Sequence, residues 1–152
     1  MMLSGHIIAS GVTAAWFGVA TKSPTAAAAC FLGGIFIDLD HAFDFFLMRK
    51  RVPRSYVELV DFCKEPTGKI YLFLHSYELM ALLWATCFWG KLPLVFVGAL
   101  FGMSVHLLLD QLTNPVHPVG YFISYRIKLG FPKSVFLYNQ LAEETASTTR
   151  NL

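Results

Sequence analysis

The chain has 152 residues, enough for one ordinary domain, but its composition is not that of an ordinary soluble protein. Hydrophobic residues make up 55% of it and charged residues only 14%, whereas soluble domains carry about 25% charged residues. The twelve Lys and Arg residues nearly balance the ten Asp and Glu residues, which leaves a net charge of +2. This composition argues against a soluble enzyme, a disordered tail and a nucleic-acid-binding module, and it favours a membrane protein.

Four apolar segments follow one another along the chain and predict an all-α, multi-pass membrane protein. They cover residues 5–20, 25–48, 70–89 and 92–112. Because a bilayer core of about 30 Å needs about 20 helical residues, the last three are long enough to span it. The first is short, but its many small residues suit close helix packing. With turns at 21–24 and 90–93, the segments predict two helical hairpins that form a bundle of about four transmembrane helices.

The remaining segments mix aromatic with charged residues and are expected outside the bundle. Residues 49–69 predict a short interfacial helix, and residues 115–138 predict a second interfacial stretch along the headgroups. Basic residues among aromatic ones also occur in nucleic-acid-binding proteins, but beside a membrane helix we expect membrane lipids and no nucleic acid as partners. Residues 1–142 are predicted to form a single domain, and residues 143–152 a flexible tail.

The positions of the Lys and Arg residues indicate the orientation of the bundle. Ten of the twelve lie in residues 49–69 or after residue 112. The other two, Lys22 and Lys91, lie in the two short turns. The positive-inside rule therefore places both termini and the 49–69 segment in the cytoplasm.

Acidic residues and histidines inside the apolar segments are the strongest functional signal. Five of the ten acidic residues and four of the five histidines lie there, without a Lys or Arg among them. A charged side chain at membrane depth is costly unless it is paired, and a divalent metal ion balances carboxylates and imidazoles together. The residues concerned are Asp38, Asp40, Asp44, Glu78, Asp110, His6, His41, His75 and His106.

Their spacing predicts one shared site. His106 and Asp110 are four residues apart on one helix face, and Asp38 and His41 are three apart. In the predicted orientation, all the candidate ligands lie toward the cytoplasmic ends of four helices. We expect a divalent metal, most readily Zn²⁺ because imidazoles are so prominent, and more than one ion if all candidates bind. The candidate ligands are His6, Asp38, Asp40, His41, His75, His106 and Asp110.

The same residues resemble the motifs of a known family. The run 34–41, Gly-Ile-Phe-Ile-Asp-Leu-Asp-His, resembles the "PDIDH" element of the YdjM-type metal-dependent hydrolases of the bacterial inner membrane. His75-Ser76 resembles their "THS" element, and residues 102–113 resemble their "G-x-x-x-H-x-x-x-D-x-x-T" element. His6 stands where they place an N-terminal histidine. Ile37 replaces a usual Pro and Leu74 a usual Thr, which leaves the ligand positions intact.

The resemblance covers roughly residues 5–120 and implies an enzyme. The family is similar in turn to zinc-dependent phospholipase C, so it implies a hydrolase of the bacterial inner membrane. Such an enzyme would cleave a phospholipid or another lipid phosphate ester with a metal-activated water. Asp40 would then bridge or support the metal, and Glu78, one turn beyond His75, is the best candidate for a general base.

Several alternatives stay open from the sequence. The metal could be purely structural, or the protein could bind or transport divalent cations. His117 could reach the site or be solvated, and Arg126 and Lys128 could hold a lipid headgroup or form a positive-inside flank. The sequence leaves open the lipid, the number of ions and whether the protein forms an oligomer.

Overall fold

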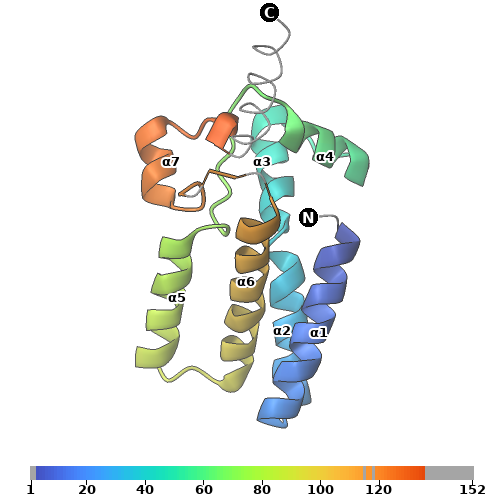
Figure 1. The fold of residues 1–152 in the computed structure, drawn as a ribbon, viewed down its shortest axis with the longest axis vertical. Coiled ribbons are helices and arrows are strands. Elements are labelled where there is room, and N and C mark those ends of the chain that lie inside the picture. The colour runs from blue at the N-terminus through green and yellow to red at the C-terminus, as the bar shows by residue number, and fades with distance from the viewer. Residues whose placement is uncertain (1–2, 115, 118, 136–152) are drawn as a thin grey trace, which may run out of the picture.

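The computed structural model describes residues 3–114, 116–117 and 119–135 (Figure 1). Its regular structure is helical within these residues, apart from one isolated antiparallel bridge between Lys69 and Pro132. The all-α prediction is therefore confirmed for the part of the chain that the structure describes. The elements are α1 (Leu3–Thr21), α2 (Pro24–Phe36), α3 (Leu39–Arg49), α4 (Tyr56–Lys64), α5 (Tyr77–Trp89), α6 (Leu94–Thr113), α7 (Ile123–Leu129) and the 3₁₀-helix η1 (Lys133–Val135).

Four of the helices form a group with roughly aligned axes, and the other helices cover one end of this group. Helices α1, α2, α5 and α6 run roughly along a common direction, and α3, α4 and α7 gather at one end of them (Figure 1). The short connections between α1 and α2 and between α5 and α6 lie at the opposite end. Helix α6 contacts each of the other three helices of the group.

Glycine brings the backbones of α2 and α6 together. Gly98 and Gly102 lie four residues apart on one face of α6. A Cβ atom added to Gly98 would lie 2.3 Å from the carbonyl oxygen of Ala26, and one added to Gly102 would lie 1.9 Å from that of Cys30. Both distances are too short for any side chain, so only glycine permits this contact. Small residues allow the same close approach between helices in membrane proteins.

The glycine face of α6 continues into polar residues. His106 and Asp110 follow Gly102 at steps of four residues, so they lie on the same side of the helix one and two turns further on. Both are buried. The helix contact therefore carries these two side chains to the level of α2 at which that helix ends.

The second predicted helix, residues 25–48, is interrupted in its middle. Helix α2 ends at Phe36 and α3 begins at Leu39, with Asp38 as the N-cap residue of α3. The backbone N–H of Asp38 donates to the carbonyl of Ile35, three residues earlier, at 3.2 Å. This tighter turn places Asp38 at a junction between two helices.

The third predicted helix, residues 70–89, is wrong in its first part. Helix α5 covers only its last 13 residues, about 20 Å of helix, and residues 70–76 are not helical. Ser76 is the N-cap of α5, and its side chain accepts a hydrogen bond from the backbone N–H of Leu79. Ser76 followed by Glu78 is a helix-start signal that the hydropathy pattern conceals.

The 49–69 segment contains α4, as predicted, and folds back on the end of α3. Glu58 pairs with Arg51 and accepts a hydrogen bond from the backbone N–H of Arg54 at 2.6 Å. These two contacts lower the pKa of Glu58 to about 2. Arg49 pairs with Glu65 in the same way, so ion pairs join the two helices.

The predicted interfacial stretch 115–138 contains α7 and η1, but two of its basic residues face inward. Arg126 and Lys133 are 0% and 2% exposed, whereas Lys128 is exposed. The Nζ atom of Lys133 donates to the carbonyl of Phe62 and lies 3.5 Å from the centroid of its ring. Burial of Arg126 leaves it neither to hold a lipid headgroup nor to form an exposed positive-inside flank, so neither alternative given for this residue fits. The predicted tail 143–152 lies outside the described residues.

Two helical stretches in the described residues are long and apolar enough to cross a membrane. They are Pro24–Arg49, which joins α2 and α3, and Leu94–Thr113, which is α6. The predicted number of four spans is not confirmed. Helix α5 is shortened by the non-helical residues 70–76, and α1 carries polar residues, His6 among them, in an otherwise apolar sequence.

We predict that Gly102→Ala destabilises the protein because the new methyl group would overlap the backbone of α2. Overpacking of this kind typically costs about 1–3 kcal/mol, and here no flexible side chain can move away. Gly11→Ala is the matched control, since a Cβ atom there meets nothing within 4 Å and gains up to about 1 kcal/mol of helix propensity. Thermal unfolding in detergent measures both. Equal unfolding temperatures for the two variants would contradict the backbone contact.

Candidate metal centre

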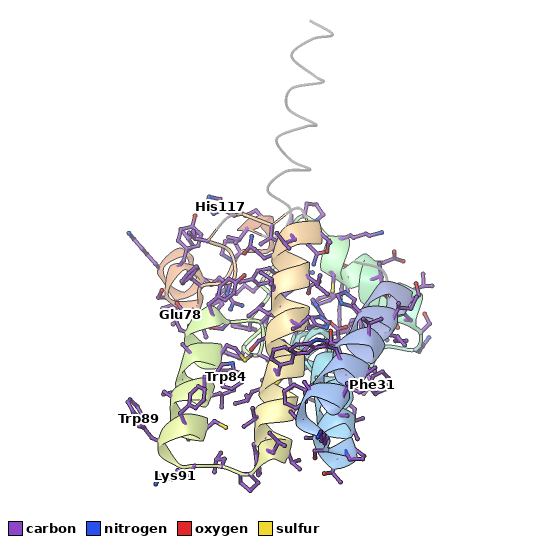
Figure 2. All side chains as sticks on the ribbon, turned by 60° about the horizontal axis from the view of Figure 1, so that its bottom comes forward. Phe31, Glu78, Trp84, Trp89, Lys91 and His117 are labelled. Atoms are coloured by element: carbon purple, nitrogen blue, oxygen red, sulfur yellow. The ribbon has the colours of Figure 1, made fainter. Side chains whose placement is uncertain are left out.

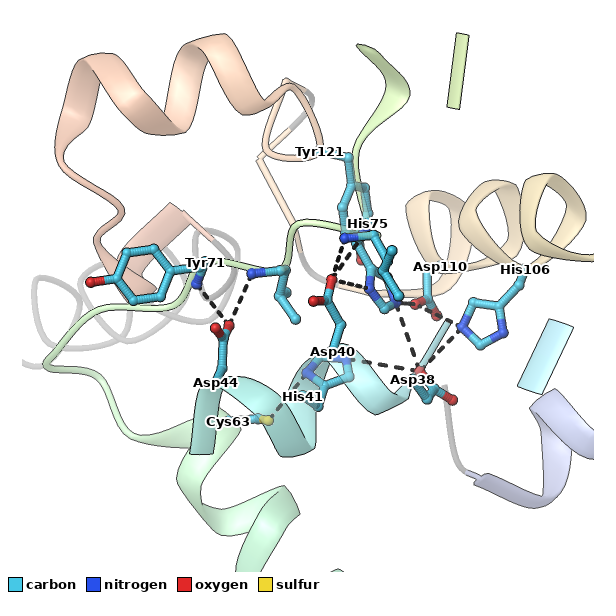
Figure 3. A network of polar contacts seen from close by, with 12 residues as sticks. Asp38, Asp40, His41, Asp44, Cys63, Tyr71, His75, His106, Asp110 and Tyr121 are labelled. Carbon is cyan, nitrogen blue, oxygen red and sulfur yellow. Dashed lines mark hydrogen bonds and ion pairs between the residues drawn. The ribbon is translucent and has the colours of Figure 1, made fainter. Parts of the chain in front are cut away.

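Four side chains from distant parts of the chain meet near the α2–α3 junction (Figure 3). Asp38 comes from the junction itself, His75 from the residues before α5, and His106 and Asp110 from the last two turns of α6. One nitrogen or oxygen atom from each lies within 4.8 Å of the others. The three partners of Asp38 are buried, and its own side chain is 25% exposed.

The atoms of this cluster are spaced for one shared ion. His106 Nε2 lies 3.3 Å from Asp38 Oδ1 and 3.4 Å from Asp110 Oδ2. His75 Nε2 lies 3.7 Å and 3.5 Å from the same two oxygen atoms. A tetrahedral ion with bonds of about 2.0–2.1 Å keeps its ligand atoms about 3.3 Å apart. The cluster could therefore hold a metal ion.

The carbonyl of Gly34 determines which nitrogen of His106 faces the cluster. His106 Nδ1 lies 2.6 Å from that carbonyl oxygen, which can only accept, so Nδ1 donates its hydrogen there. In the neutral ring Nε2 then holds the lone pair that binds a metal. Nε2 is buried and has no hydrogen-bond partner among the described residues. Metal-binding histidines usually donate their other ring N–H in this way, so the arrangement fits a metal ligand.

Asp40 supports His75 from behind and is not one of the four clustered groups. Asp40 Oδ2 lies 3.4 Å from His75 Nδ1, the ring nitrogen that faces away from Asp38. The same oxygen accepts hydrogen bonds from the backbone N–H groups of Leu74 and His75, at 2.5 and 3.2 Å. Of the two roles expected for Asp40, the geometry matches the supporting one.

His6 lies on the α1 side of the cluster, next to Asp110. Its Nε2 atom is 3.3 Å from Asp110 Oδ1, and its ring stacks on His106 with the centroids 4.1 Å apart. Asp110 thus directs one oxygen atom to His6 and the other to His75 and His106. His6 is buried beside the four-residue cluster and contacts it through Asp110 and His106.

His41 lies on the exposed side of the cluster, beside Asp38. Its Nε2 atom is 3.9 Å from Asp38 Oδ1, and its side chain is 26% exposed. Its Nδ1 atom lies 3.5 Å from the Sγ atom of Cys63. Burial raises the pKa of the Cys63 thiol to about 11, so the thiol keeps its hydrogen at neutral pH and can donate it to Nδ1. His41 is therefore a neighbour of Asp38 outside the four-atom cluster.

Asp44 and Arg126 hold the segment that carries His75. Asp44 is fully buried, and its Oδ2 atom accepts hydrogen bonds from the backbone N–H groups of Tyr71 and Leu72 at 2.7 and 2.9 Å. On the other side, the guanidinium of Arg126 donates to the carbonyls of Tyr71, Leu72 and His75. Neither role was predicted from the sequence.

Glu78 in the first turn of α5 and His117 beyond the end of α6 do not belong to the four-residue cluster (Figure 2). The carboxylate of Glu78 accepts hydrogen bonds from the backbone N–H groups of Ile123 and Ser124, at 2.9 and 3.0 Å, and so caps α7. These contacts give Glu78 a structural role, and its expected role as a general base stays a prediction that they do not support. The ring of His117 stacks on Tyr125, with the centroids 5.3 Å apart.

Two further contributors to the site were missed in the sequence. The ring of Tyr121 packs against that of His75 at a centroid distance of 6.1 Å, and the carbonyl of Gly34 binds His106. Gly34 lies one helical turn before Asp38, so the pairing of two helices through glycine could have indicated it. Nothing in the local sequence marks Tyr121.

No family model, curated protein or solved structure matches the chain. The resemblance to the YdjM-type hydrolases therefore stays a prediction from short motifs. The geometry supplies an argument for a metal site that does not depend on this resemblance, because it brings Asp38, His75, His106 and Asp110 together.

We predict that His106→Ala and Asp110→Ala lose the metal, because each removes an atom of the four-membered cluster. The affinity should fall by at least about 100-fold, more than the loss of a supporting residue usually causes. Equilibrium dialysis with elemental analysis of the detergent-purified protein measures the loss. His117→Ala is the control and should retain the metal. Asp110→Ala protein that binds the metal normally would contradict the assignment.

Proposed function

We propose that the protein is a membrane-bound, zinc-dependent hydrolase that cleaves a phosphate ester of a lipid or lipid-like substrate. The observation that carries the proposal is a buried Asp/His cluster with one exposed side, formed by Asp38 and His41. The same turns of α2 and α3 expose large apolar side chains, Phe36, Leu39 and Phe43. Acyl chains could rest on this surface while a phosphate group reaches the cluster.

The apolar surface supports a place in the membrane. Only 28% and 33% of the two candidate spans are buried inside the protein, whereas a core helix of a soluble protein would be mostly buried. Helices α1 and α5 pack against these spans and expose apolar residues of their own. We therefore propose that all four helices of the group lie in the bilayer. The exposed residues on α1 and α5 include Ile8, Val12, Trp16, Val19, Leu82 and Phe88.

The distribution of charge supports an orientation. Lys22 and Lys91 lie in the connections at one end of the group. The other basic residues of the described part of the chain lie in the end of α3, in α4, α7 and η1 and in the loops beside them, at the opposite end. By the positive-inside rule the end with α4 and α7 faces the cytoplasm. The metal cluster lies at this end, so the site would open toward the cytoplasmic leaflet of a bacterial inner membrane.

Two imidazoles and two carboxylates suit zinc, which prefers such mixed nitrogen and oxygen ligands in tetrahedral geometry. When bound, a divalent ion is a Lewis acid toward phosphate oxygens and lowers the pKa of water. The chain supplies the orientation: Gly34 fixes His106, and Asp40 supports His75. His41, on the exposed side, is placed to give or take a proton at Nε2.

A structural metal is the second candidate, because four protein ligands around one ion describe a closed site. Catalytic zinc sites typically have three protein ligands and keep one position open. The two candidates differ at Asp38. It is the most exposed of the four ligands and lies on the side from which a substrate would approach. Transport of cations would need binding sites along a path across the membrane. The candidate ligands instead lie together at one end of the helices, which favours a catalytic or structural metal over transport.

We predict zinc-dependent release of phosphate or headgroup from lipid substrates in mixed micelles. A panel of phospholipids and lipid phosphates tests the substrate class, and His106→Ala serves as the inactive control. Chelated protein should lose activity and regain it with zinc while its thermal unfolding changes little. Unfolding on chelation, together with metal-replete protein that is inert toward the whole panel, would favour the structural metal.

We predict that residue 128 is accessible from the cytoplasm and residue 91 from the opposite side. Lys128→Cys and Lys91→Cys, each in a background without other cysteines, place one thiol at each exposed end of the fold. A membrane-impermeant thiol reagent added to intact cells and to inverted vesicles reports the side. Labelling of residue 128 in intact cells would refute the proposed orientation.

A further inference from the structure

We propose that Arg126 is a positioning residue of the metal centre, which holds residues 70–76 so that His75 faces the ion. The proposal rests on the metal centre of the proposed function but does not depend on hydrolysis. It gives the segment after α6 a direct influence on metal affinity, although the described ligands all precede that segment in the sequence.

The guanidinium group of Arg126 binds backbone carbonyl groups. Its side chain comes from α7, is fully buried, and donates to three carbonyl groups. Nη1 binds those of Tyr71 and Leu72, and Nη2 binds that of His75 itself at 2.9 Å. The planar guanidinium directs several N–H donors along fixed directions, whereas the single ammonium group of a lysine cannot reach three carbonyls in this arrangement.

Residues 70–76 depend on such contacts because they have no helix of their own. The backbone N–H groups of Tyr71 and Leu72 are taken by Asp44, and those of Leu74 and His75 by Asp40. Leu72 has a φ of +44°, a conformation that branched side chains rarely adopt and that its surroundings must enforce. The segment is thus held between two carboxylates on α3 and one guanidinium on α7.

The charges on the two sides compensate one another. Burial lowers the pKa of Arg126, whereas the negative charges of Asp40, Glu78 and Asp44 raise it. A neutral residue at position 126 would leave buried carboxylates without this cation, and their amide partners would lose their fixed orientation. The effect would reach the metal through His75, whose carbonyl accepts from Arg126 and whose backbone N–H donates to Asp40.

Residues just before and just after α7 are hydrogen-bonded at the two ends of the segment. The backbone N–H of Ile70 donates to the carbonyl of Phe131, and that of Tyr77 donates to the carbonyl of Tyr121, at 3.0 and 3.1 Å. Glu78 caps the first turn of α7. Arg126 therefore moves with the residues that it holds, so a displacement of α7 would be transmitted to His75.

A double-mutant cycle distinguishes positioning through His75 from a general effect on folding. Arg126→Lys should weaken Zn²⁺ binding at least tenfold, in the range typical of residues that orient a ligand. In a His75→Ala background, where Asp38, His106 and Asp110 still offer ligands, the same substitution should change affinity less than twofold. Lys128→Gln, on the exposed side of the same helix, is the matched control and should change neither background.

The spectrum of bound Co²⁺ provides a readout that stability alone would not alter. Arg126→Lys should shift the ligand-field bands of the Co²⁺ protein, and Lys128→Gln should leave them unchanged. Thermal unfolding of the metal-free variants is measured in parallel. If Arg126→Lys fails to fold, Asp44→Asn replaces it in the same cycle with the same expectation. This substitution weakens the hydrogen bonds that hold the backbone N–H groups of Tyr71 and Leu72 on the α3 side of the segment.

Three outcomes overturn the proposal. Unchanged affinity and spectrum in Arg126→Lys would refute it while leaving the metal centre intact. An equal loss with and without His75 would show that Arg126 acts on the fold and not through this ligand. Wild-type protein that binds neither Zn²⁺ nor Co²⁺ would overturn the metal centre, and the proposed function with it.

Discussion

The backbone contact between α2 and α6 is the constraint on which the candidate site depends. Gly102 allows the two helices to approach until no side chain fits between them, and the carbonyl of Gly34 then comes within reach of His106. If the helices were separated by even a methyl group, this hydrogen bond would lengthen and the ring could turn. The orientation of a polar ligand is thus determined by the smallest residues in the apolar part of the bundle.

A second constraint is the satisfaction of backbone groups where helices end. Residues 70–76 and the start of α7 have backbone groups without a regular helical partner, and charged side chains supply hydrogen bonds to several of them. Asp44, Glu78 and Arg126 therefore form hydrogen bonds mainly with backbone groups. This explains why buried charged residues occur in a chain of such apolar composition, and why not all of them belong to the candidate metal centre.

The sequence predicted one shared site, and four of its seven candidate ligands come together in the structure: Asp38, His75, His106 and Asp110. His106 and Asp110 share a helix face by spacing alone, whereas their meeting with Asp38 and His75 was inferred from a common level in the membrane. The sequence did not predict the distant contacts that position these side chains. Glu78 was expected at the site because it lies one turn from His75, but α5 begins at Tyr77, so helical spacing does not apply between them. Hydropathy predicted a helix over 70–76 because it cannot register hydrogen bonds from distant side chains.

The shortness of α5 has a consequence for the surrounding lipid. Its 13 residues extend about 20 Å, against a hydrocarbon core of about 30 Å, so α5 in a bilayer would produce hydrophobic mismatch along one side of the protein. Trp89, which is exposed at the far end of this helix, would anchor that end in the interface. The bilayer would then become thinner beside α5, at the end where residues 70–76 replace helix. Headgroups of the cytoplasmic leaflet would be drawn inward there, so a phosphate group could approach the depth of His75 while its lipid remains in the membrane.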